Sequence, residues 1–460
     1  MAIPIREYLQ KTIASSKEIQ DVTGKNQRTV ARELKEMGKE VIQLKEGRTP
    51  KYALTRNAFG GDDELPLVMV DVHGNKNLVA IIRPLAYGGF FVEPITGIPS
   101  VLLGEKGNGL YDDLPFFLSD LAPQGFLGRQ IAAEISTQSA DFPSDPRRWG
   151  SSHIGRYLVS NGDDLPGNFR FGQQAFLRVR RKPEVTTEKD YPNLADSVMN
   201  GVIPGSSAGG EQPKFTTYCG SLSAHVIVKF SPRGDTDIAR RWRDILITEF
   251  YATEAIHSLD LPAAETRLIE KDDRLFLESK RFDRQGEYGR TSMVSLHSID
   301  AEFTGLGSNW IEVVSALNQK DLVGDFNVYD VEVLWSFGRL INNTDMHLGN
   351  LSFSIEGGVF RLLPVYDMCS MGFAPKSNGE VTPYSFTPMK PRAFNINEKT
   401  FGVVREAVKG FWQNVANDDR ISAEFRDYLV SGNPIDRMQE AMGNPDSIPH
   451  QTDIPFSEPK

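Results

Sequence analysis

The chain has 460 residues, of which 40% are hydrophobic and 24% are charged, and its formal net charge is −10. This composition is that of a folded globular protein and excludes a largely disordered or collagen-like chain. The two cysteines, Cys219 and Cys369, are too few for a disulfide framework or a thiolate zinc site. No apolar run approaches the roughly 18 residues of a membrane span, and the N-terminus has no signal-peptide core. We therefore expect a cytoplasmic protein with no membrane partner.

Charge is unevenly distributed along the chain. Residues 1–56 hold 12 Lys and Arg against 7 Asp and Glu, so this segment carries +5 while the remainder carries −15. A small basic segment on an acidic body predicts that only the basic segment meets a polyanion.

Residues 1–56 predict three short helices and a hairpin. Helices are expected over 4–10 and 17–24, and a third begins after Asn26, which is a favourable N-cap. Two β-rich runs follow within 41–54. This order is typical of a winged helix-turn-helix, although a small protein–protein module with a charged face is the alternative. The predicted DNA contacts are Gln27, Arg28, Arg32, Lys35, Arg48 and Lys51.

The middle of the chain predicts a scaffold. Residues 58–64 (AFGGDDE) are typical of a linker, and β-like runs begin at Leu67. Helical stretches follow around 115–160, and no catalytic pattern is found there. The stretch 181–193 is interpreted as a surface loop or a joint between subdomains.

A glycine-rich run, GSSAGGEQPKF (205–215), has the chemistry of an anion-binding loop. Small residues let backbone N–H groups wrap anionic oxygens, and Lys214 adds a positive charge. No G-K-[ST] closes the run, so it is not a Walker A motif. An ordinary surface loop fits the same residues.

The next run, AHVIVKF (224–230), alternates as a strand does and carries Lys229. A lysine at this place is what a nucleotide phosphate clamp requires, whereas a lysine that protects an edge strand is the alternative. A helical pattern over 240–259 places Glu249 on its apolar stripe, where a carboxylate is costly unless paired. Lys229 is the expected partner, and a glutamate at the rim of the core is the alternative.

Residues 341–370 are the most informative segment. Asp345 and Asn350 have the D-x4-N spacing of a kinase catalytic loop, in which the Asp accepts the substrate hydroxyl proton and the Asn holds Mg²⁺. We expect a structural hydrogen-bonding role for His347, because no partner stands at metal-ligand spacing. Cys369 is expected to be a packed thiol.

A hairpin is predicted around Gly357 and Gly358. Folding the chain back there places residue 350 near residue 365. Asp367 then lies at the open end of the hairpin, where it and Asn350 would share one Mg²⁺.

Four stretches together resemble the HipA family of bacterial serine/threonine kinase toxins: 206–214 (SSAGGEQPK), 226–230 (VIVKF), 280–284 (KRFDR) and 342–370 (NNTDMHLGN…VYDMCS). LPFFLSDLAPQG and GDDLPGNFRFG resemble the family's N-terminal subdomain. The resemblance implies an α+β, two-lobed fold related to protein kinases and the cofactors ATP and Mg²⁺. It also implies a protein substrate such as an aminoacyl-tRNA synthetase or another translation factor.

The resemblance also implies residue roles. Asp345 becomes the catalytic base, and Asn350 and Asp367 become the Mg²⁺ ligands. Family members autophosphorylate a serine in the phosphate loop, and here Ser207 falls at that position, with Ser206 as the second candidate. The implied nucleotide-binding residues are Lys229, Ser207, Ala208, Gly209, Gly210, Lys214 and Glu249.

Three features depart from the family. Lys280 stands where the family has an acidic hinge residue, and residues 301–310 (AEFTGLGSNW) are unlike its substrate-facing segment. The family toxin pairs with a separate DNA-binding antitoxin, whereas this chain has a basic N-terminal segment of its own, so the sequence leaves open whether a separate antitoxin exists.

The predicted organisation is therefore a winged helix-turn-helix (1–56), a HipA N-terminal-like subdomain (65–190), a kinase core with a helical lobe (195–445) and a disordered tail (446–460). The predicted function is a Mg-ATP-dependent protein kinase with its own DNA-binding domain. A DNA-binding regulator whose kinase fold only senses nucleotide is the alternative, and a small-molecule kinase is a third reading.

Overall fold

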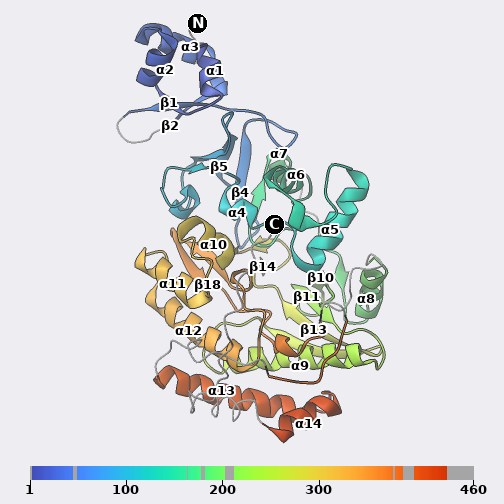
Figure 1. Cartoon of the computed structure of the whole chain (residues 1–460). Helices are drawn as coiled ribbons and strands as arrows, with labels where there is room; N and C mark the ends of the chain where they lie inside the picture. Colours follow the sequence, from blue (N-terminus) through green and yellow to red (C-terminus); the bar gives the residue numbers. More distant parts are fainter. Residues whose placement is uncertain are drawn as a thin grey trace.

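The computed structural model describes residues 3–44, 49–162, 164–177, 182–201, 212–376, 379–386 and 398–432. The predicted tail and the glycine-rich run up to Glu211 lie outside these residues. Figure 1 shows three successive units: a small N-terminal head, a middle domain, and a larger core whose last helices lie at the end opposite the head.

The head consists of residues 3–56. It comprises α1 (Ile5–Leu9), β1 (Ala14–Ser15), α2 (Ser16–Thr23), α3 (Gln27–Glu36), β2 (Val41–Leu44) and β3 (Lys51–Leu54). The strands form a sheet in the order β1-β3-β2, which together with the three helices is the topology of a winged helix-turn-helix. The three predicted helices and the hairpin are confirmed, whereas the two-residue β1 was not predicted.

Two local signals of the head are confirmed. Gly24 ends α2 with a left-handed φ of 68°. The side chain of Asn26 caps α3 by accepting a 2.9 Å hydrogen bond from Thr29 N. The apolar face of these helices closes over a small core formed with Leu54.

The segment expected to be a linker is anchored. The ring of Phe59 stacks on Phe90 of the middle domain, with centroids 5.7 Å apart. It also occupies the space over Gly155, where a Cβ atom would lie 2.1 Å from the ring. Thr55 in addition forms an isolated β-bridge with Leu85. Residues 58–64 connect the head to β4 (Leu65–Val70) without a helix or strand of their own, as a linker does, and the ring of Phe59 packs against the core of the middle domain.

The middle domain is a five-stranded antiparallel sheet in the order β7-β6-β5-β4-β8, with helices packed against it (Figure 1). Its strands are β4 (Leu65–Val70), β5 (Lys76–Pro84), β6 (Phe90–Pro94), β7 (Leu110–Tyr111) and β8 (Phe169–Phe171). Its helices are α4 (Phe116–Ser119), α5 (Gly125–Gln138), α6 (Ser151–Asn161) and α7 (Gln173–Leu177). The strands and the following helices agree with the sequence pattern.

The first lobe of the core is a second five-stranded sheet, in the order β12-β13-β11-β10-β9. Its elements are β9 (Val185–Thr186), α8 (Tyr191–Asn200), β10 (Lys214–Cys219), β11 (Ala224–Phe230), α9 (Asp237–His257), β12 (Thr266–Lys271) and β13 (Arg274–Lys280). Because β9 pairs with β10, this sheet begins before residue 195, the boundary expected from the sequence.

The second lobe is mainly helical. It contains β14 (Arg284–Gln285), β15 (Gly289–Arg290), β16 (Val294–Ser295), α10 (Leu296–Phe303), α11 (Trp310–Gln319), α12 (Asp325–Leu340), β17 (Ser352–Glu356), β18 (Val359–Leu362), α13 (Glu398–Asn417) and α14 (Ala423–Ser431). Strands β16, β17 and β18 form a small sheet beside α10. No helix within the described part of the chain is long and apolar enough to cross a membrane.

Candidate active site

Lys229 lies at the centre of a buried cluster of charges. Strand β11 lies between β10 and β13, so its lysine is not on an edge strand. Lys229 is 5% exposed, and its Nζ atom is 2.6 Å from Oε2 of Glu249 and 2.7 Å from Oδ1 of Asp367. Glu249 itself is 3% exposed on α9. The expected Lys229–Glu249 pair is present, and the alternatives of an edge lysine and a rim glutamate are excluded.

Asp367 is held beside two lysines. Its backbone has a left-handed φ of 54°, and Val365, two residues earlier, forms a parallel β-bridge with Ala263. Oδ2 of Asp367 is 4.0 Å from Nζ of Lys214. Burial alone would raise the pKa of Asp367, but the ammonium groups of Lys229 and Lys214 outweigh it and hold this pKa well below its usual range.

Lys229 is correspondingly held in its charged form. Burial opposes the charge, yet the carboxylates of Asp367 and Glu249 outweigh burial and raise the pKa of Lys229 above its usual value. The cluster therefore presents a fixed ammonium group at the boundary between the two lobes of the core.

The loop that carries Asp345 is built by local hydrogen bonds after α12. Asn342 adopts a left-handed φ of 62°, and Asn343 N donates to Gly338 O at 2.8 Å. The side chain of Asn343 then accepts a 3.0 Å hydrogen bond from Asp345 N. Because of these bonds, the chain leaves the helix in one defined direction.

Asp345 and Asn350 contact each other within this loop. Nδ2 of Asn350 donates to Asp345 O at 2.6 Å and lies 3.4 Å from Asp345 Oδ2. The Asp345 side chain is 51% exposed, so its carboxylate is open to an incoming hydroxyl group. The expected catalytic base, Asp345, and the expected metal ligand Asn350 are thus adjacent.

His347 makes the hydrogen bond expected of a structural residue. Its Nδ1 atom accepts from Gly349 N at 3.0 Å, and its carbonyl oxygen accepts from Trp310 Nε1 at 2.9 Å. Its Nε2 atom lies 3.7 Å from Asp345 Oδ1, beyond hydrogen-bond distance.

The hairpin after Asn350 has the predicted register. Glu356 pairs with Val359 across the two glycines, which brings the strand ends at residues 350 and 365 together. The hydroxyl of Tyr366 donates to Gly349 O at 3.1 Å. The residues next to Asn350 and Asp367 are therefore directly joined.

The donor set fits Mg²⁺ and does not fit zinc. Within the described ranges, no three His, Cys, Asp or Glu residues come together as a metal site. One amide oxygen, from Asn350, and one carboxylate, from Asp367, suit a hard cation that keeps water and phosphate oxygens as its other ligands. The adjacent lysines suit those phosphates.

Several predicted residues lie elsewhere. Ser206, Ser207, Ala208, Gly209, Gly210 and Arg48 are outside the described residues. Four of the predicted DNA contacts are exposed on α3: Gln27, Arg28, Arg32 and Lys35. Lys51 is half-buried on β3. Cys369 is a packed thiol as expected, since it is 5% exposed and burial raises its pKa.

Sequence reasoning missed the charges that join the middle domain to the hinge after β13. Asp283 is 4% exposed and accepts hydrogen bonds from Arg281 Nε at 3.0 Å and from Gly167 N at 2.9 Å. Arg284 Nη2 donates to Asp164 Oδ1 at 2.9 Å. The alternating charges of the KRFDR run (280–284) are the sequence signal for these contacts.

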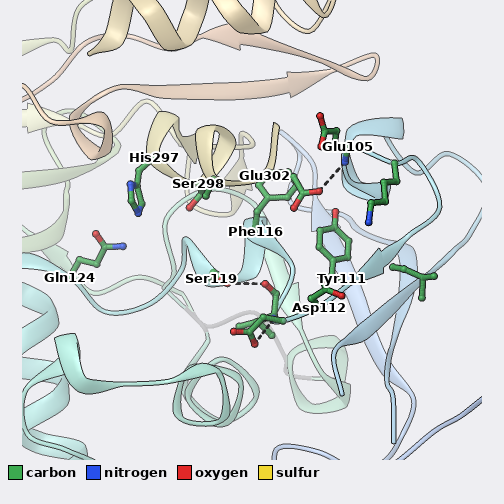
Figure 2. A pocket seen from close by; sticks show the side chains of 14 residues that line it. Glu105, Tyr111, Asp112, Phe116, Ser119, Gln124, His297, Ser298 and Glu302 are labelled. Carbon is green, nitrogen blue, oxygen red and sulfur yellow. Dashed lines mark hydrogen bonds between the residues drawn. The ribbon is translucent and has the colours of Figure 1, made fainter. Parts of the chain in front are cut away.

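A cavity of about 420 Å³ also escaped the sequence analysis. It lies between the middle domain and α10, and Figure 2 shows Phe116 and Tyr111 on one side and Ser298 and Glu302 on the other. Burial raises the pKa of Glu302 and outweighs the hydrogen bond from Glu105 N, which lowers it. The cavity is a separate feature from the Lys229 cluster.

Comparisons with known proteins find matches over most of the chain. Residues 61–180 match the family described as YjjJ-like toxin, middle domain, and residues 206–423 match the HipA-like C-terminal domain. The chain is 35% identical to Toxin YjjJ of Escherichia coli (strain K12) over 395 residues, which cover 84% of this chain and 86% of that protein.

One solved structure shows a similar fold. A chain from the HipA, HipB and operator DNA complex of Shewanella oneidensis MR-1 superposes with a TM-score of 0.57 at 15% identity, covering 82% of this chain and 97% of that chain. The Helicobacter pylori proinflammatory kinase CtkA, also at 15% identity, covers 52% of this chain and 92% of its own. Its TM-score is 0.34, which is too low to bear on the fold.

Proposed function

This chain belongs to the YjjJ-like members of the HipA toxin family, and from that premise we propose that it is an ATP- and Mg²⁺-dependent serine/threonine protein kinase. The observation that carries the proposal is the contact of Lys229 with both Glu249 and Asp367. In protein kinases, the lysine–glutamate ion pair and the metal-binding aspartate must both be in place for transfer.

The chain's own residues would act mainly by positioning and by charge. Lys229 would hold the α and β phosphates, and Lys214 would add a second positive charge beside Asp367. Asn350 and Asp367 would hold Mg²⁺. When bound, this ion would neutralise the charge that develops on the transferred phosphoryl group.

Asp345 would accept the proton of the substrate hydroxyl. Its exposed carboxylate and its contact with Asn350 support this role, since the acceptor and the metal-binding loop are then held together. The proposed substrates are a serine of the chain's own phosphate loop, Ser207 or Ser206, and a protein target, with an aminoacyl-tRNA synthetase or another translation factor as the first candidates.

The experiment is incubation of the full chain with Mg-ATP, followed by mapping of phosphate by peptide mass spectrometry. Asp345→Asn should carry no phosphate, whereas the wild type should carry it on Ser207 or Ser206. Asp321→Asn is the matched control, because it makes the same change at another exposed aspartate of the second lobe. Phosphate at the wild-type level in Asp345→Asn would contradict the role of Asp345. To find the protein target, the wild-type chain would be incubated with Mg-ATP and proteins of a bacterial lysate.

We also propose that the head binds DNA. Support comes from the winged helix-turn-helix topology and from the exposed cationic and amide side chains of α3. Because the chain combines this head with a kinase-like core, a DNA-binding regulator that senses nucleotide is the second candidate function. Nucleotide binding without phosphate transfer would favour this second function.

A further inference from the structure

We propose that Asp120, in the middle domain, is a positioning residue for the metal-binding pair Asn350 and Asp367. The middle domain would then be a working part of the catalytic centre. This inference rests on the proposed kinase function.

Asp120 caps a helix of the core from another domain. It follows α4, and its carboxylate accepts hydrogen bonds from Ser295 N and Ser298 Oγ, each at 2.8 Å, and from the Ser295 hydroxyl. Ser295 is itself the N-cap of α10. A carboxylate at this end of a helix satisfies free N–H groups and interacts favourably with the helix dipole. Asp120 therefore fixes the first turn of α10.

The first turn of α10 is joined to the strand that follows Asn350. Leu296 N donates to Leu351 O at 2.7 Å. Ser295 also pairs with Ser352 in the β16–β17 ladder. Because Leu351 directly follows Asn350, a shift of α10 would move the backbone at that ligand.

Ser352 extends the same path to Asp367. Its hydroxyl is 2.7 Å from the hydroxyl of Tyr366, which also donates to Gly349 O. Tyr366 directly precedes Asp367. Both proposed ligands, Asn350 and Asp367, are thus connected to Ser352, and Asp120 positions Ser352 through Ser295.

A second contact of the middle domain reaches the same tyrosine. Gly167 N donates to Asp283, which lies next to Phe282 in the hinge. The ring of Phe282 is 5.8 Å from that of Tyr366. The middle domain therefore meets this tyrosine along two separate paths, through α10 and through the hinge.

The packing around Asp120 makes its polar contacts important. Figure 2 looks onto the same junction, where Ser298 and Glu302 of α10 lie beside Phe116 of α4. The ring of Phe116 contacts Phe303 at 5.5 Å, but the cavity of about 420 Å³ occupies the space beside them. Since side chains do not fill this space, hydrogen bonds carry more of the coupling between α4 and α10.

The test compares Asp120→Asn with Asp141→Asn in the full chain. Asp141 is the matched control, because it makes an exposed ion pair with Arg156 inside the middle domain and is not among the contacts with the core described above. Calorimetric titration with ADP at rising Mg²⁺ concentrations should show that Asp120→Asn needs about 10-fold more Mg²⁺, as when other outer-shell partners of metal ligands are changed. Binding of ADP without Mg²⁺ should stay at the wild-type level.

Amide hydrogen exchange without nucleotide gives a second readout. Peptides covering 349–353 and 364–369 should exchange faster in Asp120→Asn than in the wild type and in Asp141→Asn. Wild-type exchange and wild-type Mg²⁺ dependence in Asp120→Asn would overturn the inference. Ser298→Ala, which removes only one of the hydrogen bonds to Asp120, is the fallback if Asp120→Asn does not fold, and it should show the same changes to a smaller degree. If the wild type binds no Mg-ADP, the proposed function fails, while the exchange measurement still tests the coupling.

Discussion

Nζ of Lys229 lies 2.7 Å from Oδ1 of Asp367, in a position where it also contacts Glu249. One lysine thus neutralises two carboxylates that come from α9 and from the segment after β18. Among the residues that the structure describes, no other cation pairs with either carboxylate at so short a distance, since Lys214 is 4.0 Å from Asp367. The integrity of the site therefore depends on this single side chain.

Lys229→Met should both destabilise the fold and abolish nucleotide binding. Removing one partner of a buried ion pair leaves uncompensated charge, which typically costs about 3 to 5 kcal/mol in the free energy of unfolding. Urea denaturation would measure this change. Lys280→Met, at the exposed pair with Glu265, is the control and should change stability by no more than about 1 kcal/mol.

The double variant Lys229→Met/Glu249→Gln separates stability from function. Because it removes one of the two uncompensated charges, it should regain part of the stability but none of the phosphoryl transfer. Recovery of transfer would contradict the role of Lys229 in holding phosphates.

His347 can be dissected with two amides. In His347→Asn, the side-chain oxygen takes the place of Nδ1, which accepts a hydrogen bond from Gly349 N. In His347→Gln, the side-chain amide takes the place of Nε2, which lies near Asp345. Because only the Nδ1 contact is a hydrogen bond, His347→Asn should keep activity near the wild-type value. His347→Gln should lose about 1 kcal/mol of stability through the lost cap, and activity with it. Steady-state kinetics and thermal denaturation would measure both, and the reverse order of activities would mean that His347 acts on Asp345 directly.

The DNA-binding proposal predicts a change in salt dependence. Arg28→Ala and Arg32→Ala remove exposed charges on α3, and each lost phosphate contact should lower the slope of log affinity against log salt by about 1. Fluorescence anisotropy with duplex DNA at several salt concentrations would measure the slope. Lys189→Ala, an exposed charge on the body, should leave the slope unchanged. Equal effects of all three variants would indicate non-specific attraction to the whole chain.

Replacement of Glu302 by Gln should stabilise the fold in a pH-dependent way. Burial raises the pKa of Glu302 in the folded state and outweighs the hydrogen bond from Glu105 N, so the ionised form of Glu302 opposes folding at pH above this pKa. Glu302→Gln should raise Tm at pH 7.5, and the difference from the wild type should shrink as pH falls toward 4, where Glu302 itself takes up a proton.

Asp71→Asn is the control of opposite sign. Hydrogen bonds from the backbone and side chain of Asn75 lower the pKa of Asp71, so its ionised form supports folding. Its replacement should lower Tm at pH 7.5, and this loss should vanish on acidification. A pH-independent effect of Glu302→Gln would mean that packing, and not charge, governs this cavity.

Local signals explain what was correctly predicted. The Asn26 cap, the left-handed Gly24 and the turn at Gly357 and Gly358 depend on residues within a few positions of one another, and all three are present. Glu249 required a longer step: a carboxylate on an apolar helical stripe needs a cation, and Lys229, which lies inside a β-like run, is that cation.

The sequence by itself determined the local elements of this protein, the family to which it belongs and the residue types of its candidate site. Tertiary structure decided that Phe59 packs against the core of the middle domain and that Asp120 caps α10. It also decided that Asp283 joins the hinge to Gly167. The physical reason is distance along the chain: periodicity and capping report neighbours a few residues away, whereas these contacts join segments whose proximity depends on how whole domains pack.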